Sequence, residues 1–388
     1  MRVLQLIKTS IGMKWTVHQT RELVKLGVEV HVALPEDGPR VPEYRAAGVH
    51  VHFMQTDFPF RQPWRFPHLC KDFRNLVDRI QPALIHSHFV GPTLTMRLAL
   101  GKSHPVPRLF QVPGPLHLEH PLLRQTELAT AGKPDYWIGS CAWTCQCYRQ
   151  SGVAANRLFL SYYGTNLDLF KHAARGKLRQ ELNLNSQLKL VGIVAFMYAP
   201  KRFLGQTRGL KGHEDLIDAL AICQKIDPDI RGVFVGGAWN NATAYERQVQ
   251  MYGRKQCGDS IVFLGTRHDV PDLYPDLDVV VHPSHSENVG GAVESLLAGV
   301  PTIATNVGGF PDLIHHGETG WLVPPRDPAQ LAQTILNVLH APEYARQIGL
   351  QGQAYARKLF DVRATAQDIV QIYSTVLSDV AVPAISIK

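Results

Sequence analysis

The chain has 388 residues, of which 45% are hydrophobic and 19% are charged. This composition is typical of a folded globular protein and excludes a disordered one, and the length favours two domains. The net charge of +7 favours an anionic partner. Because no long Lys/Arg run or nucleic-acid-binding motif occurs, we exclude nucleic acid and expect phosphorylated ligands or an anionic membrane surface.

The first part of the chain alternates short apolar runs with helical patterns. Strands are expected at residues 2–8 and 28–34, with a helix at 16–26 between them. The first run is too short for a signal peptide, and no run of about 18 apolar residues follows, so we expect a cytoplasmic protein. Further strands are expected at 83–88, 108–112, 135–139 and 157–160. Strands that are apolar on both faces and alternate with helices indicate a parallel sheet.

Aromatic and basic side chains are interleaved before the third of these strands. They are Phe58, Phe60, Arg61, Trp64, Arg65, Phe66, Lys71, Phe73 and Arg74. Such a segment can attach a protein peripherally to an anionic inner membrane surface. A loop that folds onto the following helix would have much the same composition, and we favour this second interpretation.

A second series of strands follows in the other half of the chain. We expect strands at 188–196, 232–236, 260–264, 278–282 and 302–305. Two consecutive series of strands and helices indicate two doubly wound domains. Turn-forming residues at 162–170 mark the joint, so the domains are expected at 1–165 and 166–361.

The stretch that begins at the strand 278–282 has the pattern of a phosphate-binding site. A polar loop follows the strand, then Gly290 and Gly291, and then a helix that begins at Ala292. A glycine pair at a helix N-terminus, just beyond the carboxyl edge of a parallel sheet, lets an anion approach unpaired backbone N–H groups.

Two glutamates flank this glycine pair, Glu287 in the loop and Glu294 in the first turn of the helix. If a diphosphate lies at the helix N-terminus, Glu287 can hydrogen-bond a group beyond the phosphates and Glu294 can hydrogen-bond a ribose. Alternatively, Glu294 only favours the first turn of its helix, and Glu287 is a solvated loop residue. In isolation the pattern supports both interpretations equally.

A second glycine-rich turn at 305–314 and the segment 316–325 complete the pattern. In this order, the segments resemble the C-terminal domain of retaining glycosyltransferases of family 4, which have the GT-B fold. The resemblance implies an α/β protein with two Rossmann-like, doubly wound parallel-sheet domains that face a central cleft. It also implies that the N-terminal domain lies on the acceptor side, that the C-terminal helix 362–388 joins it, and that the C-terminal domain binds the nucleotide sugar.

Further motifs extend the resemblance over nearly the whole chain. Lys211-Gly212 is similar to the family's lysine-glycine pair, in which the lysine reaches the donor diphosphate. Gly236 matches the turn after the next strand, and Thr266-Arg267 matches the segment whose main chain receives the nucleobase. Gly12 stands where the glycine loop of the N-terminal domain faces the phosphates.

The chain departs from the family pattern in three places. Glu287 and Glu294 are seven positions apart, whereas the family spaces them eight apart, so the loop is one residue shorter. Proline replaces the histidine of a His-Gly pair after the strand 108–112, and His117 is the first candidate to replace that histidine, ahead of His120 and Glu119.

The third departure concerns an arginine that usually precedes the lysine-glycine pair. The stretch 198–210 has the character of an insertion, and the arginine is not in register. Arg208 is the best substitute because it lies nearest to Lys211, ahead of Lys201 and Arg202.

With these substitutes, the resemblance implies three catalytic residues and a set of donor-binding residues. The catalytic residues are Glu287, His117 and Lys211. The donor-binding residues are Gly12, Arg208, Lys211, Gly236, Thr266, Arg267, Asn288, Val289, Gly290, Gly291 and Glu294. Asp276 and Asp278 form an Asp-x-Asp pair, but they stand at the entrance of a buried strand, so we expect neither a metal nor a cofactor.

The resemblance implies the retaining transfer of a hexose from a UDP-sugar, with glucose the first choice, to a glycan or lipid-linked acceptor in polysaccharide biosynthesis. Two alternatives stay open. A UDP-sugar epimerase on the same fold would form product from the donor alone. A non-catalytic sugar-nucleotide-binding protein would bind UDP without transfer or donor hydrolysis.

Overall fold

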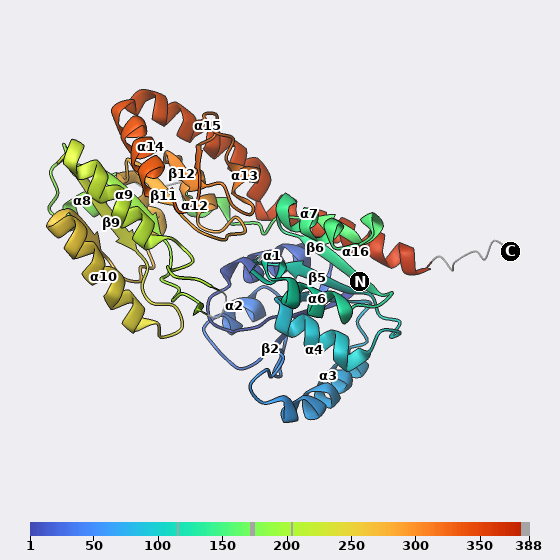
Figure 1. Ribbon diagram of the computed structural model, residues 1–388. Coiled ribbons are helices and arrows are strands. Elements are labelled where there is room, and N and C mark those ends of the chain that lie inside the picture. Colours follow the sequence, from blue (N-terminus) through green and yellow to red (C-terminus); the bar gives the residue numbers. More distant parts are fainter. Residues whose placement is uncertain (115, 171–174, 203–204, 382–388) are drawn as a thin grey trace. The chain divides into compact units, whose positions relative to one another are not determined.

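The computed structural model describes residues 1–114, 116–170, 175–202 and 205–381 (Figure 1). The chain divides into two compact units, the first formed by residues 1–166 and 359–388 and the second by residues 167–358. Each unit contains one parallel β-sheet with helices packed against it. The expected α/β class with two Rossmann-like sheets is therefore confirmed.

The sheet of the first unit has seven strands in the order β3-β2-β1-β4-β5-β6-β7, and all of its neighbours are parallel. The strands are β1 (Arg2–Leu6), β2 (Glu29–Leu34), β3 (His50–Phe53), β4 (Leu84–His88), β5 (Arg108–Val112), β6 (Asp135–Gly139) and β7 (Leu158–Leu160). The order reverses between β1 and β4, which is the switch point of a doubly wound sheet.

Helices cover both faces of this sheet. They are α1 (Lys14–Lys25), α2 (Val41–Ala46), η1 (Pro63–Arg65), α3 (Phe66–Ile80), α4 (Val90–Leu100), α5 (Leu116–Glu119), α6 (Pro121–Ala129), α7 (Ala142–Gln150), η2 (Ala155–Arg157) and α16 (Val362–Ala381). Because successive side chains of a strand point to opposite faces, Val3 of β1 packs in the cluster with Val17 of α1 and Tyr373 of α16. Its neighbour Leu4 packs in the cluster with Phe73 of α3.

The sheet of the second unit has six parallel strands in the order β10-β9-β8-β11-β12-β13. The strands are β8 (Lys189–Val194), β9 (Ile230–Val235), β10 (Ile261–Phe263), β11 (Val279–His282), β12 (Thr302–Thr305) and β13 (Trp321–Val323). Here the order reverses between β8 and β11. The strands β3 and β13 were not expected from the sequence, because each is a short edge strand without a long apolar run.

The second unit has both short helices and longer ones. They are η3 (Leu167–Phe170), α8 (Lys177–Glu181), α9 (His213–Ile226), α10 (Thr243–Cys257), η5 (Gly258–Ser260), α11 (Val270–Leu273), η6 (Tyr274–Asp276), α12 (Ala292–Leu297), α13 (Phe310–Leu313), α14 (Pro328–His340) and α15 (Pro342–Phe360). Of the longer helices, α10 and α14 pack against α9, and all three pack against the sheet. The core includes Leu216 and Leu220 of α9, Phe234 of β9 and Ile335 of α14.

The chain returns to the first unit after α15. The backbone N–H of Arg363 donates to Asp361 Oδ1 over 3.0 Å, so Asp361 caps α16. The helix continues to Ala381 and packs against α1. The tail from residue 382, which was expected to belong to the C-terminal helix, lies outside the described residues.

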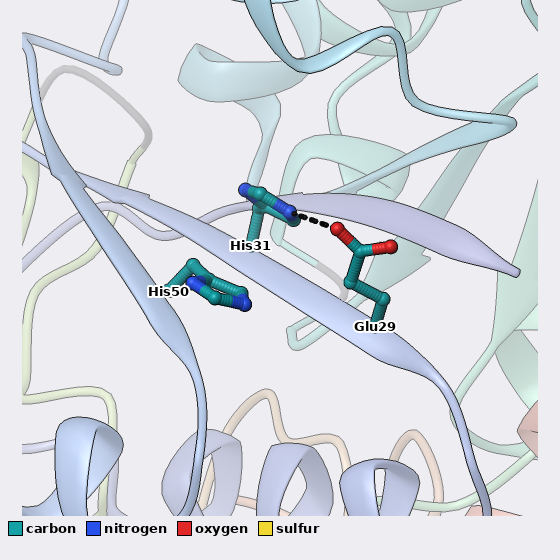
Figure 2. Close-up of side chains that lie close together, drawn as sticks. All are labelled: Glu29, His31 and His50. Carbon is teal, nitrogen blue, oxygen red and sulfur yellow. Dashed lines mark hydrogen bonds and ion pairs between the residues drawn. The ribbon is translucent and has the colours of Figure 1, made fainter.

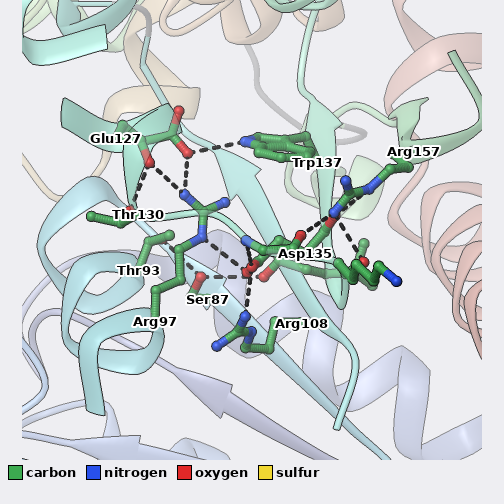
Figure 3. Close-up of polar contacts among 12 residues, drawn as sticks. Ser87, Thr93, Arg97, Arg108, Glu127, Thr130, Asp135, Trp137 and Arg157 are labelled. Atoms are coloured by element: carbon green, nitrogen blue, oxygen red, sulfur yellow. Dashed lines mark hydrogen bonds and ion pairs between the residues drawn. The ribbon is translucent and has the colours of Figure 1, made fainter. Parts of the chain in front are cut away.

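A network of four fully buried charged side chains joins two helices to the sheet of the first unit (Figure 3). Asp135 of β6 accepts from Arg97 of α4 over 3.0 Å and from Arg108 of β5 over 2.6 Å. Arg97 also pairs with Glu127 of α6, which accepts from the Trp137 indole N–H over 3.0 Å. The network therefore anchors α6, the helix that follows His117.

The aromatic and basic segment of the first unit folds onto α3. The ring of Phe58 packs against that of Phe66 with centroids 4.9 Å apart, and Phe73 is buried. Phe60 and Trp64 remain exposed. Within the part of the chain that the structure describes, no helix is both long and apolar enough to cross a bilayer.

Candidate active site

The switch point of the second sheet brings two loops together at its carboxyl edge. The loop between β8 and α9 carries Lys211, and the loop between β11 and α12 carries Glu287. β8 and β11 are neighbours whose connections leave in opposite directions, and doubly wound proteins have their ligand crevice beyond the carboxyl ends of such a pair. Ligands of doubly wound proteins bind in such a crevice.

Lys211 and Glu287 form an ion pair between these two loops, through Lys211 Nζ and Glu287 Oε2. Only 17% of the lysine side chain and 10% of the glutamate side chain are exposed. The loops are also joined by their backbones, because His285 N–H donates to Leu210 C=O over 2.9 Å. A Cβ on Gly212, whose φ is 69°, would lie 2.0 Å from the Pro283 carbonyl oxygen, so only glycine allows this approach.

The position of Glu287 is determined by its immediate neighbours. Its Oε1 accepts from the backbone N–H of Asn288 over 3.1 Å. A Cβ on Gly308 would lie 1.8 Å from the Glu287 carbonyl oxygen, and a Cβ on Gly290 would lie 2.8 Å from Oε1. Both glycine-rich turns noted in the sequence therefore leave room for Glu287, which is a packed and partnered residue and not a solvated one.

Gly290 and Gly291 precede α12, and Gly291 is its N-cap. Because α12 has only 6 residues, its helix dipole is small. The N–H groups of its first turn would therefore contribute most to the binding of an anion. Glu294 lies in this first turn, and Tyr274 donates to its Oε2 over 3.5 Å. Burial raises the pKa of Tyr274 well above its usual range, so the hydroxyl stays a donor. Asn288 and Val289 are buried.

Gly236 and Thr266 lie at the carboxyl ends of β9 and β10, on the other side of β8 from Glu287. Gly236 has a φ of 122°, and a Cβ there would lie 2.1 Å from the Ala195 carbonyl oxygen. Its N–H donates to Gly265 C=O over 2.8 Å. Thr266 is exposed, whereas the Arg267 guanidinium pairs with Glu181 and Asp269. The side chain of Arg267 is thus engaged at the surface.

Arg208 forms ion pairs with two carboxylates. Its guanidinium pairs with Asp215 and, over 2.7 Å, with Asp218. Asp215 also pairs with His285 of the Glu287 loop, and the ring of Tyr198 lies 5.7 Å from Lys211 Nζ. The sequence did not mark Tyr198 or His285 as neighbours of the Lys211 segment, because each comes from a different part of the chain.

The remaining predicted residues, Gly12 and His117, belong to the first unit. Gly12 follows β1 at the switch point of that sheet and has a φ of 77°. His117 lies in α5 and is 8% exposed, and its Nε2 and the Tyr148 hydroxyl are 3.2 Å apart. Burial lowers the pKa of His117 to about 4, so its imidazole is neutral near pH 7.

Asp276 and Asp278 have structural partners. The Asp276 carboxylate accepts from the N–H groups of Gly176 and Leu178 over 2.6 and 2.7 Å. Asp278 pairs with Arg175 and Arg179, each over 2.9 Å. These carboxylates hold the α8 segment against the sheet.

Comparison with known families decides the identity of the chain. Glycosyl transferases group 1 match residues 202–355, and Glycosyltransferase Family 4 matches residues 14–169. The chain belongs to the family 4 glycosyltransferases. The two matches fall on different units, so each unit of this family 4 chain is recognised by itself.

Solved structures show the same fold over nearly the whole chain. Alr3699/HepE of Anabaena, solved in complex with UDP-glucose, has a TM-score of 0.80 at 22% identity and covers 97% of this chain and 100% of its own. Sucrose-phosphate synthase from Thermosynechococcus elongatus has a TM-score of 0.79 at 21% identity, with 97% and 99% covered. At this identity the likeness shows the fold alone, which is GT-B.

The chain also resembles curated glycosyltransferases. D-inositol 3-phosphate glycosyltransferase of Segniliparus rotundus is 29% identical over 217 residues, 55% of this chain and 46% of that protein. Putative glycosyltransferase EpsD of Bacillus subtilis is 31% identical over 166 residues, 42% of each chain. The chain thus spans about half the length of the curated relatives it matches.

Buried histidines should make the stability of this family 4 chain depend on pH. Burial lowers the pKa from 6.5 to about 3 for His86 and His282, and to about 4 for His117 and His213. Between pH 6.5 and 4 the unfolded chain binds more protons than the folded chain, so stability falls as pH falls. Each histidine contributes up to about 1.4 kcal/mol per pH unit.

Urea unfolding at pH 7 and at pH 5 measures this dependence. The urea midpoint should be lower at pH 5 than at pH 7. His117→Gln should reduce the difference between the two midpoints by the contribution of one histidine. Equal midpoints at the two pH values would show that these histidines are not held neutral in the folded chain.

Proposed function

We propose that this chain is a hexosyltransferase that moves a sugar, with glucose the first choice, from a UDP-sugar to a hydroxyl of a glycan or lipid-linked acceptor. Transfer retains the anomeric configuration and uses no metal. The observation that carries the proposal is the Lys211–Glu287 pair at the switch point, because it places a cation and a carboxylate in the crevice where this fold binds ligands.

Each residue of the site has a defined part in this proposal. The Lys211 ammonium leaves Glu287 and neutralises the diphosphate, which gains negative charge as the glycosidic bond breaks. The freed Glu287 carboxylate then accepts from hydroxyls of the donor sugar, and Glu294 accepts from the ribose. Asn288, Val289, Gly290 and Gly291 supply backbone contacts to the diphosphate.

The outer parts of the site complete the donor contacts. The main chain at Gly236, Thr266 and Arg267 receives the nucleobase, while Arg208 supports Lys211 electrostatically. Gly12 and His117 of the first unit are assigned by the family resemblance alone, Gly12 to the phosphates and His117 as a neutral hydrogen-bonding group. No residue here serves as a covalent nucleophile in the proposal, so the leaving phosphate oxygen accepts the proton of the acceptor hydroxyl.

The choice of UDP draws on the similar proteins. HepE is described in complex with UDP, with UDP and glucose, and with UDP-glucose. The positive net charge of +7 suits a phosphorylated donor and an anionic membrane surface, at which the chain would be cytoplasmic and peripheral.

A thermal-shift panel of UDP-, GDP- and ADP-sugars tests the donor. We expect UDP-glucose to raise the unfolding midpoint and the GDP and ADP sugars to leave it unchanged, because a ligand that binds only the folded chain stabilises it. A shift with GDP- or ADP-sugars alone would exclude UDP. In the samples with UDP-glucose, slow hydrolysis of the donor should release UDP, and the rate should be the same with and without EDTA. Binding of UDP without release would instead indicate a non-catalytic protein, and a new UDP-sugar would indicate an epimerase.

A further inference from the structure

Three potential metal ligands, Glu29, His31 and His50, lie together in the first unit on the neighbouring strands β2 and β3 (Figure 2). His31 and His50 are partners in the parallel register, and Glu29 lies two positions before His31 on β2. Residues two apart on a strand share a face of the sheet, so the three side chains project on the same side. One ligand atom from each lies within 4.8 Å of the other two.

A fourth residue, His52, orients the central ligand. His31 Nε2 lies 3.1 Å from Glu29 Oε1, and the rings of His31 and His50 are stacked with centroids 4.7 Å apart. His31 Nδ1 lies 2.9 Å from His52 Nε2. Metal-bound imidazoles characteristically donate their other ring N–H to an acceptor, which fixes the tautomer. A metal bound by Nε2, between His31 and Glu29, requires the His31 proton on Nδ1, from which it would be donated to His52 Nε2.

We propose that Glu29, His31 and His50 bind one divalent transition-metal ion, zinc being the expected ion. Two imidazoles and one carboxylate form a donor set that zinc accepts in tetrahedral geometry, with water as the fourth ligand. Calcium and magnesium prefer oxygen ligands alone, so this set disfavours them. Glu29 and His50 are exposed, so an ion can reach the site from solvent.

The ion would connect strands and take no part in sugar transfer. Glu29 and His50 begin their strands, so they stand at the amino edge of the sheet, whereas Gly12 follows the carboxyl end of β1. β3 is an edge strand whose only sheet neighbour in the described chain is β2, and the ion would link the two. Arg2 bonds Glu29 Oε1 over 2.7 Å and Ile80 C=O over 2.7 Å, which holds the carboxylate in position but adds an opposing positive charge.

Titration calorimetry with Zn²⁺ on the full chain, freed of any purification tag and of bound metal, tests the site. We expect one ion per chain, and we expect His50→Gln to abolish this binding. His52→Gln should weaken it about 10- to 100-fold, since His52 acts through His31. His68→Gln is the matched control, because His68 is an exposed histidine 3.4 Å from Asp72 with no third ligand among the residues that the structure describes, and this variant should bind Zn²⁺ as the unaltered chain does.

Thermal unfolding supplies a second readout that does not depend on transfer activity. Zn²⁺ should raise the unfolding midpoint of the unaltered chain and of His68→Gln but not of His50→Gln. Because His50 is exposed, His50→Gln should fold normally without metal, and its metal-free midpoint checks this. A chain without a saturable site, or a His50→Gln variant that binds Zn²⁺ like the unaltered chain, would overturn the proposal.

Discussion

Replacing Lys211 by alanine should lower kcat for sugar transfer about 10²- to 10³-fold, the usual effect of removing one preorganised group that stabilises transition-state charge. The lysine meets the diphosphate as it leaves, and its side chain is only 17% exposed, so water cannot substitute for it fully. Release of UDP under saturating donor measures kcat. Lys211→Arg keeps the positive charge and should recover part of the rate.

The control for this experiment is Lys225→Ala. Lys225 is an exposed lysine in the last turn of α9, the helix that begins just after Lys211, and its loss should leave kcat unchanged. Turnover by Lys211→Ala at the rate of the unaltered chain would refute the proposed site.

A variant of Glu287 distinguishes the role of this glutamate from that of Lys211. Glu287→Gln should still bind UDP, as judged by the thermal shift with UDP alone, but should lose most of the transfer, because Glu287 is assigned to the sugar and not to the nucleotide. If Glu287→Gln lost the UDP shift as well, the assignment of the sugar end to Glu287 would be wrong.

Replacing Asp135 by alanine should reduce the free energy of unfolding by about 3–5 kcal/mol, the cost of removing one partner from a buried ion pair. Asp135 is shared by Arg97 and Arg108, and all three side chains are fully buried. The substitution also removes the acceptor for the Gly132 N–H, which lies 2.6 Å from Asp135 Oδ2. Two buried guanidinium groups would then have lost a common carboxylate. Urea unfolding at pH 7 measures the loss.

Asp72→Ala is the matched control in the same unit. Asp72 lies on the exposed side of α3 and its side chain is 47% exposed, so its removal should change stability by no more than about 0.5 kcal/mol. A loss below about 1 kcal/mol for Asp135→Ala would mean that water or a neighbouring group replaces the carboxylate, contrary to the burial of the network.

Central strands and the edge strands β7 and β10 were predicted from the sequence, whereas the edge strands β3 and β13 were not. The expected strands 108–112 and 302–305 have the observed bounds of β5 and β12. A strand buried on both faces is recorded in the sequence as a continuous apolar run. β3, with the sequence His-Val-His-Phe, alternates polar and apolar residues and is half exposed, so it has no such run.

The residues of the candidate site were predicted from separate motifs, but the contacts between these residues were not. Lys211 and Glu287 are 76 positions apart, and only the adjacency of β8 and β11 brings them into contact. Arg208 was chosen for its closeness to Lys211 in the sequence, yet it is held by Asp215 and Asp218. The pattern Glu-x-His in β2 and His-x-His in β3 likewise shows no metal site until the two strands pair.

The sequence alone was enough to predict the α/β class, the two Rossmann-like sheets and the family, because hydrophobic periodicity and glycine-bearing turns are local properties of the chain. The partner of each charged side chain depended on the tertiary structure. Strand order decides which loops meet at the carboxyl edge of a sheet and which side chains become buried, and burial in turn decides whether a carboxylate must have a partner and whether a histidine stays neutral.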